Sequence, residues 1–72
     1  NPILISFLWV CKDRRRDKDN VVAGGRKPIL DSLEKAGIVR RDSWKLIFGF
    51  EDRFEVDKAN PRVEVSLREV VL

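Results

Sequence analysis

Hydrophobic and polar positions divide the chain into an apolar block, a charged block and several patterned segments. Residues 3–11 are apolar except for Ser6, and many of them are β-branched or aromatic. Because both alternating faces are apolar, this segment predicts a strand covered on both sides, either a central strand or one at a dimer interface. A buried helix is the competing interpretation, but the length and the β propensity favour the strand.

Residues 12–20 follow at once, and all of them except Asn20 are charged. No hydrophobic core can use such a segment, so it belongs at the surface. If the strand continued through this block, Asp13, Asp17 and Asp19 would point to the same side. Asp17 and Asp19 would then lie roughly 7 Å apart along the extended backbone.

A helix is predicted next, with Asp19 or Asn20 as its N-cap and an end near Ala36, just before Gly37. Pro28 interrupts the pattern because it lacks the N–H that a helix interior needs. We therefore expect a kink, or a restart with Pro28 as the first residue of a second helix. The apolar stripe of the helix consists of Val22, Ile29, Leu33 and Ala36, with Leu30 beside it.

The C-terminal half predicts two further strands. Residues 44–50 place Trp44, Leu46, Phe48 and Phe50 on one face, and a bend or bulge at 51–53 precedes a resumption at 54–56.

Residues 57–61 form a turn cluster. Residues 62–72 then alternate until Glu69 breaks the inward series. The inward side chains are Val63, Val65, Leu67 and Val71, and the outward ones are Arg62, Glu64, Ser66 and Arg68. The order β-α-β-β predicts an α+β fold, one helix on a small mixed or antiparallel sheet, in one domain over residues 1–72.

Length and net charge limit the number of domains and the kinds of partner that the chain can have. A chain of 72 residues forms one domain at most and has a small core, so oligomerisation or a missing segment would help it to fold. The chain opens on Asn1-Pro2 without a methionine, which suggests a missing N-terminal segment, with processing as the alternative. The net charge of +3 suits an anionic partner without requiring one.

Absent residue types exclude several kinds of chemistry. The chain has no histidine and one cysteine, Cys11, so Ser-His and Cys-His catalysis, an intrachain disulfide and a multi-thiolate zinc site are excluded. We interpret Cys11 as a small buried hydrophobe in a reducing, cytoplasmic setting. The apolar run at 3–10 is too short to span a bilayer and lacks signal-peptide features, so no membrane association is expected.

The carboxylates of the charged block suit Mg²⁺, which binds one or two protein oxygens together with substrate phosphate. Asp17 and Asp19 form a local pair, and a third carboxylate must come from elsewhere. Spacing leaves that third position open among Asp42, Asp13, Asp31 and Asp52. Composition alone favours a plainer interpretation, in which the alternating charges form a solvated loop of self-neutralising ion pairs.

The order of several short motifs resembles the RusA family of Holliday junction resolvases. They are the DRRRDKDN block at 13–20, Lys27, the ILDSLEKAGI block at 29–38 and Asp42, within a resemblance that runs from about Trp9 to Glu69. It implies a homodimeric endonuclease that requires Mg²⁺, with Mn²⁺ as a possible substitute, and nicks four-way DNA junctions symmetrically. The residues that it implies are Asp17, Asp19 and Asp42 as metal ligands and catalytic carboxylates, Lys27 as the catalytic lysine, and Arg14, Arg15 and Arg16 as contacts to the DNA backbone.

Other interpretations remain at this stage. Without the resemblance, Lys27 is a surface lysine paired with Asp31, four residues further along the same helix. The chain as a whole could be a non-catalytic nucleic-acid-binding module whose arginines bind phosphate. It could also be a structural subunit that buries residues 3–10 against a partner.

Overall fold

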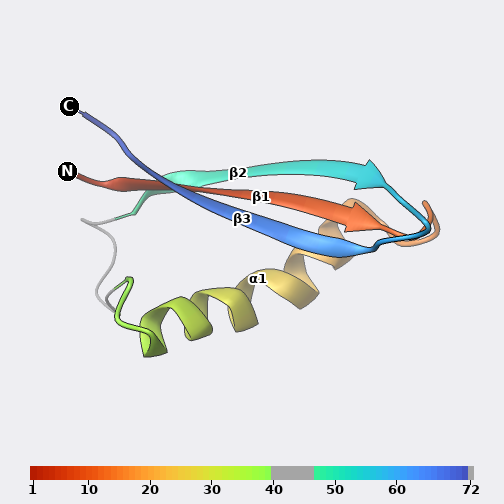
Figure 1. Cartoon of the computed structure of the whole chain (residues 1–72), viewed down its shortest axis with the longest axis horizontal. Helices are drawn as coiled ribbons and strands as arrows, with labels where there is room; N and C mark the ends of the chain where they lie inside the picture. The colour runs from red at the N-terminus through yellow and green to blue at the C-terminus, as the bar shows by residue number, and fades with distance from the viewer. Residues whose placement is uncertain (40–46, 72) are drawn as a thin grey trace.

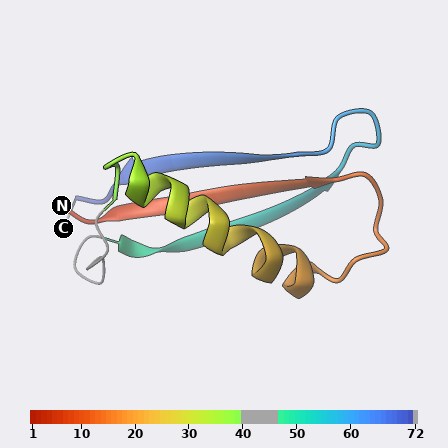
Figure 2. The same ribbon diagram turned by 90° about the horizontal axis from the view of Figure 1, so that it is seen from below.

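The computed structural model describes residues 1–39 and 47–71, which form a three-stranded sheet with one helix across one face (Figures 1 and 2). The elements are β1 (Ile3–Cys11), α1 (Lys18–Lys35), β2 (Ile47–Val56) and β3 (Arg62–Glu69). The strand order is β2-β1-β3, with β1 parallel to β2 and antiparallel to β3. The predicted α+β fold with a mixed sheet is therefore confirmed.

β1 is the central strand, as its apolar character predicts. Ile5, Phe7 and Trp9 face α1 and are almost completely buried, and the rings of Phe7 and Trp9 stack with their centroids 5.2 Å apart. On the opposite face Leu4 and Val10 are also buried. Among the described residues one helix lies against the sheet, on the face of Ile5, Phe7 and Trp9, and a covering layer on the opposite face stays a prediction.

The charged block is a loop followed by the first turn of the helix. β1 ends at Cys11, and the Asp13 carboxylate accepts a hydrogen bond of 2.9 Å from the Arg15 backbone N–H, which turns the chain. The strand does not continue through the charged block, so the condition for a common face of Asp13, Asp17 and Asp19 is not met. Asp17 has extended dihedrals (φ −64°, ψ 145°) and is the N-cap, two residues before Asp19 and three before Asn20, the two predicted N-caps.

α1 is one helix that passes through Pro28, so of the two expected alternatives, a kink or a restart, the restart is wrong. Its end is as predicted: Ala36 is the C-cap and Gly37 has a φ of +76°, a conformation that glycine adopts without steric cost. The apolar side of the helix packs on the sheet through Val21, Val22, Ile29, Leu30 and Leu33.

β2 is continuous from Ile47 to Val56, so the bend predicted at residues 51–53 is wrong. The irregularity comes earlier, because Ile3 pairs with Ile47 whereas Leu4 pairs with Gly49. Phe48 is therefore the extra residue of a bulge, and it is 59% exposed. The predicted strand residues Trp44 and Leu46 lie outside the described part of the chain.

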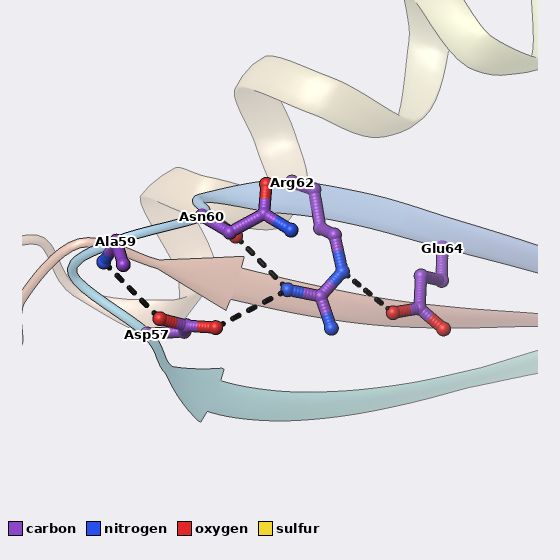
Figure 3. A network of polar contacts seen from close by, with 5 residues as sticks. All are labelled: Asp57, Ala59, Asn60, Arg62 and Glu64. Atoms are coloured by element: carbon purple, nitrogen blue, oxygen red, sulfur yellow. Dashed lines mark hydrogen bonds and ion pairs between the residues drawn. The ribbon is translucent and has the colours of Figure 1, made fainter.

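The turn between β2 and β3 is held by a polar network at its base (Figure 3). The Asp57 carboxylate accepts a hydrogen bond from the Ala59 backbone N–H (3.1 Å) and pairs with Arg62, while the Asp57 N–H donates to the Cys11 carbonyl (2.8 Å). The Arg62 Nε donates to Glu64 at 2.7 Å, and this bond, with the charges of Glu64 and Asp57, raises the pKa of Arg62 against the effect of desolvation. The turn is thereby fixed beside the end of β1.

β3 ends at Glu69, as predicted, but its inward side chains are only partly covered. Val63, Val65 and Leu67 lie opposite Trp9, Phe7 and Ile5 of β1 and so share the face on which α1 packs. They nevertheless remain 37–42% exposed, because the single helix crosses this face diagonally and leaves the turn end of β3 bare (Figure 2). We call these three residues the β3 stripe.

Candidate functional site

The loop of residues 12–17 lies where β1 ends, next to the turn between β2 and β3 (Figure 1). We call it the basic loop. It has a groove on each side. A groove of about 600 Å³ lies between the basic loop and the start of β3, with Trp9, Val21 and Val63 in its apolar lining. A second groove, of about 490 Å³, lies between the basic loop, the start of α1 and the end of β2.

The three arginines predicted to bind DNA line these grooves. Arg16 lines both of them, Arg15 lines the larger and Arg14 lines the smaller. The Arg16 guanidinium also donates a hydrogen bond of 3.4 Å to the Asn20 carbonyl, which ties the basic loop to the first turn of α1. The structure therefore places all three cations at one end of the sheet, exposed to solvent.

The two predicted carboxylates of the charged block lie close in the chain but in different settings. Asp17 lines the smaller groove, and its side chain makes no capping hydrogen bond. Asp19 is in the first turn of α1 and lines neither groove. Within residues 1–39 and 47–71, no three acidic, cysteine or histidine side chains gather closely enough to hold a metal ion.

Of the other two predicted catalytic residues, Asp42 lies outside the described residues. Lys27 is on α1, about 12 Å from Asp19 by helical rise. Its side chain is 83% exposed and pairs with Asp31 at 3.5 Å.

A polar cluster beneath α1 was not predicted from the sequence. The Arg26 guanidinium forms an ion pair with Asp52 on β2 and lies 4.7 Å from the Phe50 ring centroid and 5.3 Å from that of Phe7. Asp52 also accepts a hydrogen bond of 2.9 Å from the Trp9 indole N–H. Asp52 was one of the spacing-based candidates for a third metal ligand, and the structure instead engages its carboxylate in joining the helix to the sheet.

The charge of Asp52 is stabilised by this cluster. Partial burial by itself raises the pKa of Asp52, but hydrogen bonds from Arg26 and Trp9 and the positive charge of Arg26 outweigh it, so the net pKa is lowered. A carboxyl group with a lowered pKa in the folded state stabilises the fold above its unfolded pKa of about 3.9. That contribution is lost as the pH falls through the folded pKa.

We expect Asp52→Asn to lower the free energy of unfolding at pH 7 by about 1–2 kcal/mol, because Arg26 loses its charged acceptor at a partly exposed site. The loss should shrink as the pH falls through the lowered pKa of Asp52, because the wild-type carboxyl group then also becomes neutral. Urea unfolding followed by circular dichroism at pH 7 and pH 3 checks both points. Asp31→Asn, at the exposed ion pair with Lys27, is the control and should change stability by less than about 0.5 kcal/mol.

Comparisons with protein-family models, curated proteins and solved structures find no match. The resemblance to RusA resolvases thus rests on the motifs of the sequence. None of the described helices combines the length and the apolar composition needed to cross a membrane.

Proposed function

We propose that the protein is a RusA-like endodeoxyribonuclease that acts in the cytoplasm as a homodimer. It resolves four-way DNA junctions by paired, Mg²⁺-dependent nicking of phosphodiester bonds. The order of the motifs supports the family, and the site at the end of β1 supports a nucleic-acid substrate.

One observation carries the proposal: the smaller groove is lined by Asp17 together with Arg14 and Arg16. Phosphodiester cleavage needs a carboxylate beside cations that hold the backbone of the substrate. A solvated loop with self-neutralising charges would instead pair its aspartates with its arginines. Asp13 pairs with Arg15 in this way, at 3.9 Å, but Asp17 forms no ion pair with any described residue.

The donor set fits a magnesium ion. Mg²⁺ keeps several waters and is bound through one or two carboxylates plus phosphate oxygens, so it does not need a closed protein cage. The uncapped Asp17 carboxylate is available for such a bond, and Asp19 follows on the adjoining turn. When bound, the ion supplies Lewis-acid activation of the phosphate and of a water.

In this proposal each group of residues has a separate role. Asp17 and Asp19 hold the metal, with Asp42 as the third ligand implied by the resemblance. The arginines at 14–16 bind backbone phosphates on the two sides of the basic loop and so orient the junction. Lys27 donates a hydrogen bond to the charge that develops on the phosphate or on the leaving oxygen. The roles of Lys27 and Asp42 rest on the resemblance.

The alternative is a nucleic-acid-binding module without catalytic activity. The larger groove favours it, because cationic side chains border an apolar lining there while no described carboxylate other than Asp13 takes part. Such a module would bind through counterion release, with an affinity that falls steeply as salt increases.

A gel assay separates the two functions. The protein is incubated with a synthetic four-way junction, and separately with linear duplex of the same sequence, in Mg²⁺ and in EDTA. The nuclease proposal expects symmetric nicks in the junction alone, lost in EDTA. Salt-sensitive binding without nicking in Mg²⁺ or Mn²⁺ would contradict it and support the binding module.

A further inference from the structure

The larger groove beside the basic loop has an apolar wall that the proposed chemistry does not use. The wall consists of Val21 on α1, Pro61 just before β3 and Val63 on β3, together with the ring of Trp9. Val63 lies opposite Trp9 in the sheet and is 42% exposed. The volume of about 600 Å³ falls within the range of about 300–1,000 Å³ that small-molecule sites occupy. The groove therefore has room for a compact apolar group.

Trp9 makes this wall rigid. Its indole N–H donates a hydrogen bond of 2.9 Å to Asp52, and its ring stacks with that of Phe7. Because Trp9 is 2% exposed, the apolar surface open to a ligand comes mainly from Val63 and its neighbours in the wall. A wall that is already ordered binds more tightly, because no side-chain entropy is lost when the ligand enters.

The charges that line the groove favour a negatively charged ligand. Lys12 and Arg16 are exposed cations of the lining, and neither forms an ion pair with any described residue. The other charges of the lining are already paired, Arg15 with Asp13 and Arg62 with Asp57 and Glu64. The two free cations therefore give the groove its net positive charge.

A nucleotide of single-stranded DNA combines the two properties that the groove requires. Its phosphate is an anion, and its base is a flat body that can leave the stack and bind to a protein surface. In a duplex the same base is held inside the stack. An apolar peptide segment would match the wall but would leave the two cations without a partner.

Arg16 connects this groove to the proposed catalytic site. It lines the larger groove, and it also lines the smaller groove together with Asp17. A phosphate bound by Arg16 therefore lies between the two grooves. The nucleotide attached to that phosphate is then placed beside the apolar wall.

We infer that the larger groove binds one unpaired nucleotide of single-stranded DNA, with its base against Val21, Pro61 and Val63 and its phosphate on Lys12 and Arg16. On a branched substrate this is a nucleotide that has left its base pair next to the site of cleavage. The inference rests on the proposed function for the identity of the substrate as DNA. Binding in the groove itself needs neither a metal ion nor cleavage.

Fluorescence anisotropy in EDTA tests the base contact with two labelled probes, a short oligo-dT strand and a chain of equal length in which every base is missing. Both probes carry the same phosphate charges, so the ratio of their affinities reports the contact with the base. We expect oligo-dT to bind at least about tenfold more tightly. Lys12→Gln should weaken the binding of both probes by a similar factor and leave the ratio unchanged, because it removes a phosphate contact.

Val63→Asn tests where the base binds. The substitution makes the wall polar without changing the charge of the protein, so we expect the ratio to fall about threefold or more. Val65→Asn is the matched control. It makes the same change two positions further along β3, at a side chain that is 37% exposed and does not line the groove, and should leave the ratio unchanged. Circular dichroism establishes that each variant is folded before it is scored.

Equal affinities of the wild-type protein for the two probes would overturn the inference and leave the groove as a phosphate contact alone. A preference for oligo-dT that Val63→Asn lowers no more than Val65→Asn would also overturn it, because the base would then bind elsewhere. Nicking of junctions without a preference for oligo-dT would contradict this inference alone. A preference for oligo-dT without nicking would contradict the nuclease proposal alone.

Discussion

Asp19→Asn is expected to abolish nicking of four-way junctions while leaving junction binding intact. The amide has the shape of the carboxylate but carries no charge, so a bound Mg²⁺ loses a ligand and the protein keeps its fold. Removing even the outer partners of metal ligands costs 10–100-fold in metal affinity or activity, so we expect a rate loss of at least about a hundredfold. The net charge rises from +3 by one unit, so binding to DNA should be equal or slightly tighter.

The measurement has two arms. Nicking rates in Mg²⁺ report the chemistry, and gel mobility shifts in EDTA report the binding. Glu34→Gln is the matched control, because it makes the same change from carboxylate to amide on the same helix and Glu34 lines neither groove. Nicking by Asp19→Asn at the rate of the control would remove Asp19 from the site.

Gly25→Ala is expected to destabilise the fold by about 1–3 kcal/mol, although alanine is the better helix former. A Cβ at this position would lie 2.5 Å from Cζ3 of Trp9 and 3.0 Å from Cη2. The Trp9 side chain is 2% exposed, stacks on Phe7 and donates a hydrogen bond to Asp52, so it cannot withdraw without losing these contacts. The close approach of α1 to β1 therefore requires glycine.

Gly24→Ala is the control for that prediction. Its Cβ would meet only the Arg16 guanidinium, at 3.6 Å, which is an ordinary contact. We expect a gain of about 0.5–1 kcal/mol from helix propensity and reduced unfolded-state entropy. Urea unfolding monitored by circular dichroism measures both variants. Equal shifts in the two would show that helix propensity, and not the packing of Trp9, determines the effect.

The sequence predicts those features of the fold that depend on neighbouring residues. Gly37 ends the helix, residues 57–61 turn the chain, and the apolar run of residues 3–11 occupies the sheet centre. The exposure of the β3 stripe could not be predicted, because it depends on how much of the sheet one helix covers. A helix is about 10 Å wide, whereas three strands spaced about 4.8 Å apart present a broader surface.

The candidate site is also predicted only in part, because some of its contacts join residues that are far apart in the sequence. The charge of residues 12–20 identifies the exposed end of the sheet, but the sequence gives no sign that Asp52 is engaged by Arg26, 26 positions away. The nearest signal is that Arg26 follows Gly24-Gly25, a place where the helix can approach the sheet closely. The assembly of Asp17, Asp19, Asp42 and Lys27 into one centre stays a prediction from the resemblance.

The position of β1 has a consequence for biosynthesis. The most apolar of the described strands precedes both of its hydrogen-bonding partners, which begin at Ile47 and Arg62, and Ile3 pairs with Glu69, 66 positions later. Such long-range pairing makes closure of the sheet a late and slow event. Until β2 leaves the ribosome β1 has neither of its partner strands, and until β3 follows, one edge of β1 stays unpaired. Such an exposed hydrophobic strand is the kind of segment that chaperones bind and that aggregates when they do not.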